Sequence, residues 1–189
     1  TFSDERLHFL HRRHTADEVK NAVKRLRGIG IKNISVDLMF GFPNETLEEW
    51  NDDIERLLAL DIEHISAYSL MYEKGTPLFR LLQEGKVKEI DEELYRQMYD
   101  TLIDRLAKAG YEQYEISNFA KLLDVQSPKF NIQTSKSKIQ SLYRSQHNSS
   151  YWQNIPYIGI GAAAHSYGNG KRSWNVADIK AYITAIQKN

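Results

Sequence analysis

Apolar residues in the first third of the chain recur first at helical spacing and then in short continuous runs. Val19, Val23 and Leu26 follow a capping box at 15–18, which predicts a helix over 15–28. A second capping box at 46–49 predicts another helix, with Trp50, Ile54, Leu57 and Leu58 on one side.

Two short apolar runs between and after these helices predict strands. The run 34–40 is interrupted by Asp37 and closed by Gly-Phe-Pro, which is typical of a strand buried on both faces, and 65–71 is a second such run. Helix, strand, helix and strand at this spacing indicate a parallel α/β sheet. Since two parallel strands cannot close a sheet, we interpret this part as the tail of a larger barrel.

The alternation ends in the second half. Asp91 caps a predicted long helix that reaches Gly110, residues 111–119 are aromatic and favour an extended chain, and a final helix is predicted over about 176–186. Residues 121–146 carry Ser, Gln and Lys without a clear period, so we predict a mobile loop there.

Composition excludes several classes of protein. The 189 residues contain no Cys, which leaves no disulfide, thiolate metal site or cysteine nucleophile among them. Lys+Arg and Asp+Glu both number 25, and no basic stripe offers a footprint for nucleic acid. Charges interrupt the longest apolar runs well before the roughly 20 residues that a membrane span needs, so we expect no membrane span and a cytoplasmic protein. The chain begins at Thr1 within a run typical of a domain interior, and we expect further residues before it.

Asp37 and Arg12 are the first candidates for a ligand site. A carboxylate inside an apolar strand either faces a site at the carboxyl end of a barrel or is satisfied by backbone groups or an Arg. Arg12 lies in the cluster 11–14 (HRRH), which also fits a solvated helix edge. The pattern alone leaves both pairs of interpretations open.

The C-terminal part offers two further segments. Residues 147–152 (HNSSYW) combine an imidazole, an amide and two aromatic rings, which can ligate haem iron and cover a porphyrin, or simply form hydrogen bonds. His165 has the same two interpretations. The small residues 159–164 lack the third Gly and the acidic residue of a dinucleotide fingerprint, and close backbone packing explains them better.

Read together, the segments resemble the radical S-adenosylmethionine (SAM) family of oxygen-independent coproporphyrinogen III oxidase-like proteins. Residues 37–46 resemble its DLIYGLPGQT motif, and nearly the whole chain outside 121–146 follows the family in order. The other matching segments are HISAYSL at 64–70, EKGTP at 73–77, GYEQYEISNFA at 110–120, HNSSYW at 147–152 and YIGIGAAAH at 157–165.

The resemblance implies a fold and two cofactors. It implies an α/β class in which 1–80 are the last βα units of a partial (β/α) barrel and 81–189 an α+β C-terminal subdomain. In the family a CxxxCxxC loop holds a [4Fe-4S] cluster that cleaves SAM to a radical, as in an oxidoreductase of the coproporphyrinogen dehydrogenase type. That loop is missing here, so this chain alone is expected to be inactive. The residues that the resemblance assigns to SAM are Arg12, Asp37 and, through its backbone, Met71.

The family has two functional branches. One decarboxylates a porphyrinogen in porphyrin metabolism, and the HemW-type branch resembles a haem-binding chaperone that delivers haem to an acceptor protein. The sequences at 114–120 (YEISNFA) and 147–152 (HNSSYW) favour the chaperone branch. This branch implies His147 as haem iron ligand, with Asn148, Tyr151 and Trp152 beside the haem. A noncatalytic interaction module is the remaining alternative. Two departures stand out: the 26 residues between Ala120 and His147 exceed the family's usual handful, and Ala162-Ala163 replaces Pro-Gly.

Overall fold

The computed structural model describes residues 1–122 and 142–188, which fall into two compact units, Thr1–Arg144 and Ser145–Asn189. Most of the loop predicted at 121–146 lies outside the described residues. At its two ends, Lys121 closes a strand and Gln146 begins a helix. The predicted domain division between residues 80 and 81 stays a prediction.

A mixed four-stranded sheet organises the N-terminal unit. Its order is β1-β2-β4-β3, and only β1 and β2 are parallel. This confirms the predicted α/β class and the parallel pair. The strands are β1 (Ser35–Phe40), β2 (His64–Ser69), β3 (Tyr111–Gln113) and β4 (Asn118–Lys121).

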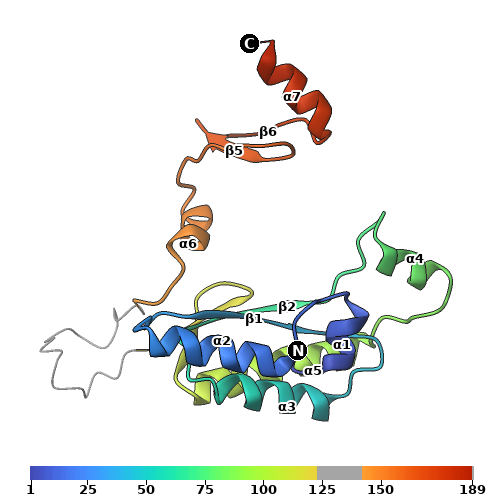
Figure 1. The fold of residues 1–189 in the computed structure, drawn as a ribbon, viewed down its shortest axis with the longest axis vertical. Helices are drawn as coiled ribbons and strands as arrows, with labels where there is room; N and C mark the ends of the chain where they lie inside the picture. The colour runs from blue at the N-terminus through green and yellow to red at the C-terminus, as the bar shows by residue number, and fades with distance from the viewer. Residues whose placement is uncertain (123–141, 189) are drawn as a thin grey trace, which may run out of the picture. The chain divides into compact units, whose positions relative to one another are not determined.

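Three helices lie on one side of this sheet (Figure 1). They are α2 (Ala16–Gly28), α3 (Leu47–Leu58) and α5 (Glu92–Lys108). Both predicted capping boxes are present, at Thr15 and Thr46, and Asp91 caps α5 as predicted. Two short helices that the pattern did not predict complete the unit, α1 (Asp4–Phe9) and α4 (Pro77–Gln83).

The core forms between the sheet and these helices. Buried and more exposed residues alternate along the end of β1, whereas residues 64–67 of β2 are all buried. Leu38 and Phe40 of β1 and Ile65 of β2 are buried against Trp50 of α3 and Leu102 of α5. The indole N–H of Trp50 donates to the Met98 carbonyl at 2.8 Å, which ties α3 to α5.

The prediction that 34–40 is buried on both faces is wrong. Asp37 is exposed and Met39 is only partly buried, whereas Leu38 and Phe40 are buried. The physical reason is that α2, α3 and α5 all cover one face (Figure 1), so the described residues leave the other face of β1 open.

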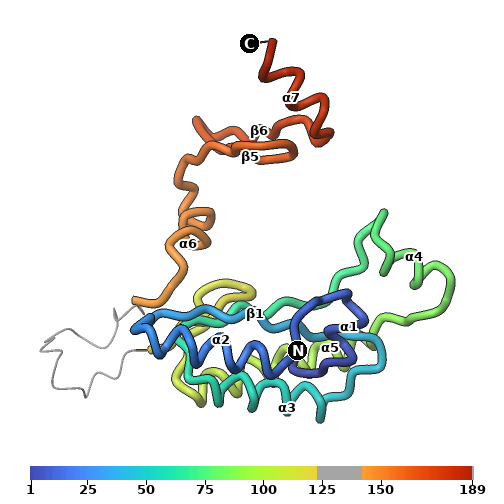
Figure 2. Tube along the Cα trace, viewed as in Figure 1, coloured from blue at the N-terminus to red at the C-terminus, as the bar shows by residue number. Residues whose placement is uncertain are grey.

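The C-terminal unit consists of a helix, a hairpin and a second helix, whose course Figure 2 traces. They are α6 (Gln146–Trp152), β5 (His165–Gly168), β6 (Lys171–Trp174) and α7 (Ile179–Gln187). Asn169 and Gly170 both have positive φ and form the tight hairpin turn. None of the unit's described residues is buried, and Ile158 and Ile160 are 85% and 87% exposed. In either described stretch of the chain, no helix has the length and apolar character that crossing a membrane requires.

A buried histidine links β1, β2 and the residue that follows β3. His64 of β2 is 5% exposed, and its two ring nitrogens lie 2.8 Å from the Ser35 hydroxyl and 2.7 Å from the Tyr114 hydroxyl. Burial lowers the pKa of His64, although the charges of Asp37 and Glu115 act in the opposite direction. The neutral ring is therefore the form that the fold favours.

This histidine predicts a pH dependence of stability. The folded pKa lies below the unfolded value of about 6.5, so its contribution is present above that pH and is lost as pH falls. We expect the free energy of unfolding to fall less between about pH 7 and about pH 5.5 in His64→Gln than in the wild type. Denaturant titrations at several pH values measure this, with the exposed His8→Gln as control. If the free energy of unfolding fell equally with pH in the wild type and in His64→Gln, the lowered pKa of His64 would be contradicted.

Candidate functional sites

The first candidate site is a hollow of about 210 Å³ along β1. It brings together Arg12, His14, Asp37 and Met39, so two of the three residues assigned to SAM share one wall. The remaining lining is mainly apolar, from the N-terminal segment, α1, α2 and β1: Thr1, Phe2, Leu7, Leu10, Val19, Val36, Leu38 and Phe42.

Arg12 is placed by the turn between α1 and α2. Its backbone N–H donates to the Leu7 carbonyl at 2.8 Å, and His11 before it has a φ of 54°. The Ala16 N–H donates to the Asp4 carboxylate at 2.8 Å, which holds the start of α2 against α1. Arg12 thus lies in a turn and not on a helix edge, and it is available to a ligand beside Asp37.

A buried glutamate holds the loop that follows β1. Glu45 accepts the N–H groups of Gly41 at 2.6 Å and Phe42 at 3.0 Å, and Arg6 lies 3.7 Å from its other oxygen. Burial raises the pKa of Glu45, while the bond from Phe42 and the charge of Arg6 lower it. Gly41 has a φ of 84°, which a side chain would disfavour. The loop therefore has one fixed path, which anchors the end of the strand that carries Asp37.

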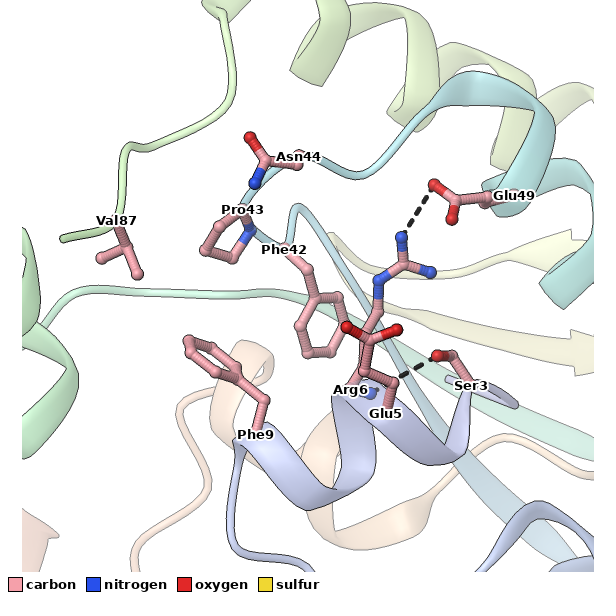
Figure 3. Close-up of a pocket in the computed structure, with 9 residues that line it drawn as sticks. All are labelled: Ser3, Glu5, Arg6, Phe9, Phe42, Pro43, Asn44, Glu49 and Val87. Atoms are coloured by element: carbon pink, nitrogen blue, oxygen red, sulfur yellow. Dashed lines mark hydrogen bonds and ion pairs between the residues drawn. The ribbon is translucent and has the colours of Figure 1, made fainter.

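A second hollow in this unit, of about 360 Å³, is lined by Phe42, Pro43 and Asn44 of this loop and by residues of α1 that include Arg6 and Phe9 (Figure 3). Arg6 crosses it to an ion pair with Glu49 at 2.8 Å and lies over the Phe42 ring, 5.7 Å from its centre. Since two carboxylates already hold this guanidinium, the hollow offers no free charge from Arg6. We assign it a structural role.

Met71 does not share the wall of Arg12 and Asp37. It follows the end of β2 by two residues, is 67% exposed, and does not line the hollow. The proposed backbone contact of Met71 stays a prediction. The signal from its sequence was weak because it came from alignment of a motif and not from the character of the side chain.

The second candidate site is a hollow of about 560 Å³ within the C-terminal unit. This volume is in the usual range for small-molecule sites. Its chemistry combines imidazole, phenol, guanidinium and aliphatic groups, and none of the described residues that line it has a carboxylate. They are His147, Tyr151, Tyr157, Ile158, Gly159, Ile160, Ala163, Ala164, His165 and Arg172.

Aromatic rings run from α6 into the hairpin. The ring of Tyr151 meets His147 edge-on at 4.9 Å and Tyr157 edge-on at 4.8 Å, and Tyr157 lies 6.3 Å from Tyr167 of β5. The Tyr151 hydroxyl and His147 Nε2 are 3.1 Å apart, because residues four apart share a helix face. An iron atom bound at Nε2 would replace this hydrogen bond.

Backbone packing shapes the other side of this hollow. Gly159 lies so close to the His165 backbone that an added Cβ would overlap the His165 carbonyl. The Asn175 amide donates to the carbonyls of Gly159 at 3.3 Å and Gly161 at 2.8 Å. Close packing is therefore what these small residues serve, as one of the two interpretations of 159–164 expected. Ala163 has a φ of 60°, so the replacement of Gly there has a real conformational cost.

The structure gathers only part of the predicted haem segment at the hollow. His147 and Tyr151 line it, whereas Asn148 and Trp152 do not. The backbone N–H of Asn148 donates to the N-cap hydroxyl of Ser145 at 3.3 Å, and the Trp152 side chain is 60% exposed. Sequence reasoning missed Arg172 and set His165 aside. The Asn-Gly pair at 169–170 is a hairpin signal that could have placed both strands together.

The residues present do not fit an iron-sulfur cluster but do fit a wall for SAM. The chain contains no Cys, and the described residues contain no group of three or more His, Asp or Glu side chains placed to hold a metal. The hollow with Arg12 and Asp37 offers a cation and a carboxylate, which suit the carboxylate and hydroxyl groups of SAM.

Comparison with known proteins gives consistent relatives. The sequence profile of the Radical SAM superfamily matches residues 1–57, which include Arg12 and Asp37. The protein named heme chaperone HemW of Bacillus subtilis is 38% identical over 98% of this chain and 44% of its own length. A Danio rerio protein, named radical S-adenosyl methionine domain-containing protein 1, mitochondrial, is 33% identical over 85% of this chain and 32% of its own length.

A solved structure shares the fold. The coproporphyrinogen III oxidase HemN of Escherichia coli, described as a radical SAM enzyme, matches with a TM-score of 0.68 and 15% identity. The match covers 100% of this chain and 42% of that chain. It confirms the predicted fold class. The chain thus spans less than half the length of these relatives.

Two substitutions test how the backbone shapes the second hollow. Gly159→Ala is expected to destabilise the C-terminal unit by on the order of 1–3 kcal/mol, because the methyl group overlaps the His165 backbone. Ala163→Gly is expected to stabilise it by about 0.5–1 kcal/mol, because Gly adopts positive φ without strain. Thermal melts followed by near-ultraviolet circular dichroism measure both. If both variants raised the melting temperature, or both lowered it, the proposed roles of Gly159 and Ala163 in the backbone would be contradicted.

Proposed function

We propose that this chain, which belongs to the radical SAM family of coproporphyrinogen III oxidase and HemW, is part of a haem-binding chaperone that delivers haem to an acceptor protein. A cytoplasmic location is part of the proposal. The observation that carries it is the hollow of about 560 Å³ that joins His147 and Tyr151 to the apolar side chains of Ile158 and Ile160.

The chemistry of this hollow suits a flat, largely apolar ligand with a metal at its centre. Imidazole is a common axial ligand of haem iron, and aromatic and aliphatic side chains pack against a porphyrin. The relatives named heme chaperone support the same ligand. His147 is the proposed iron ligand, since its helix places it on the same face as Tyr151.

The N-terminal unit would supply one wall of a SAM site. Arg12 and Asp37 are the proposed contacts, with Met71 as a backbone contact, and the cluster ligands would have to come from residues outside this chain. When bound to a cluster, SAM supplies a radical by reductive cleavage. Asp37 would accept hydrogen bonds from the ribose hydroxyls, and Arg12 would pair with the SAM carboxylate.

The oxidase function is the alternative. The two functions differ in whether the bound tetrapyrrole contains iron. A chaperone site recognises the metal through His147, whereas an oxidase site recognises a metal-free porphyrinogen. The two imidazoles at the hollow, His147 and His165, favour the haem ligand.

Substitution of His147 tests the proposed haem site. Addition of haem to the chain is expected to give a shifted Soret band, and His147→Ala should weaken binding by about tenfold because an axial ligand is lost. Absorption titrations measure this. His14→Ala, in the other unit, should have no effect, and Tyr151→Phe should bind as tightly or more tightly, because the hydroxyl no longer competes for Nε2. Equal titration curves for His147→Ala and His14→Ala would indicate nonspecific adsorption.

Substitution of Asp37 tests the proposed SAM wall in a full-length protein that contains this chain. Asp37→Ala should weaken SAM binding by about 1.5–3 kcal/mol, since hydrogen bonds to a charged group are lost. Calorimetric titration with SAM measures the change, and circular dichroism checks the fold. Unchanged affinity in a folded variant would remove Asp37 from the site.

A further inference from the structure

The C-terminal unit is basic, although the whole chain has no net charge. Within Ser145–Asn189 four side chains are basic and one is acidic, which gives a formal net charge of +3. The acidic residue, Asp178, already accepts the Ala181 N–H at 2.8 Å as the N-cap of α7. The net positive charge favours anions, and Asp178 does not line the hollow. The basic residues are Lys171, Arg172, Lys180 and Lys188.

Arg172 is the basic residue that lines the hollow. It lies on β6 opposite Tyr167 of β5, and its side chain forms no ion pair or hydrogen bond within the described parts of the chain. Lys171, its neighbour on the strand, does not line the hollow, because successive strand residues point to opposite faces. Arg172 is thus a free guanidinium beside imidazole and apolar groups.

We propose that Arg172 anchors a propionate of the bound tetrapyrrole. This rests on the proposed function, because it assumes that the hollow takes a porphyrin. A guanidinium fork matches a carboxylate with two parallel hydrogen bonds, and it fixes orientation as well as adding affinity. Arg172 lines the same hollow as His147, Ile158 and Ile160, so a macrocycle placed against the isoleucines with its iron at His147 would share that space with the guanidinium.

The same assignment narrows the class of ligand. Haem carries two propionates, whereas coproporphyrinogen carries four. The lining offers a single permanent cation, with its remaining polar groups on His and Tyr side chains. Such a wall suits a ligand with few carboxylates clustered at one edge, so Arg172 would favour haem over the oxidase substrate.

The experiment compares porphyrins that differ only in their carboxylates. Metal-free protoporphyrin IX and its dimethyl ester are titrated into the whole chain, with fluorescence as the readout and salt held constant. Because neither probe holds iron, the result does not depend on an axial ligand. The wild type should bind the free acid roughly three- to tenfold more tightly than the ester. Arg172→Gln should bring this ratio close to one, while the matched control Lys171→Gln should keep it.

Three results would overturn the proposal. The first is an acid-to-ester affinity ratio near one in the wild type, and the second is an unchanged ratio in Arg172→Gln. The third is a fall of this ratio in Lys171→Gln as large as that in Arg172→Gln, which would indicate general attraction of anions by the basic unit. A failure of the proposed iron ligand looks different, because His147→Ala would then leave the haem Soret band unchanged while Arg172 still decided the acid-to-ester ratio.

Discussion

The parallel pairing of β1 with β2 is the constraint on which the N-terminal unit depends. Asp37 lies opposite Ser66 and Leu38 opposite Ala67, so Leu38 and Ala67 share one face of the sheet while Asp37 and Ser66 share the other. A slip of one residue would bury Asp37 against Trp50 and expose Leu38. The register is therefore held by the same hydrophobic contacts that form the core, and the position of the proposed SAM contact follows from it.

The C-terminal unit is built on a different principle. It buries none of its described residues, and hydrogen bonds from side chains to the backbone, such as those that the Asn175 amide donates, hold it together in place of an apolar core. Its isoleucines therefore remain available, and a planar apolar ligand would cover Ile158 and Ile160. A ligand in so open a hollow would stay partly accessible, as the proposed delivery to an acceptor protein requires.

Local signals predicted more of this molecule than long-range ones. The capping boxes at Thr15 and Thr46 predicted two helices because both partners lie within one turn. The exposure of Asp37 could not be predicted, because it depends on which face of the sheet three distant helices cover. His147 and Tyr151 are four residues apart on one helix, so their pairing was within reach of the pattern. Arg172 lines the same hollow only because the hairpin brings it there, and no periodicity encodes that placement.

We propose that haem is held in the hollow of the C-terminal unit with its iron at His147. Diffraction at the iron absorption edge from crystals of the chain grown with haem tests this most directly. We expect one strong anomalous peak in the hollow, within coordination distance of a His147 ring nitrogen and with electron density for a propionate at Arg172. An iron peak beside Arg12 and Asp37, or at the exposed surface away from His147, would contradict it.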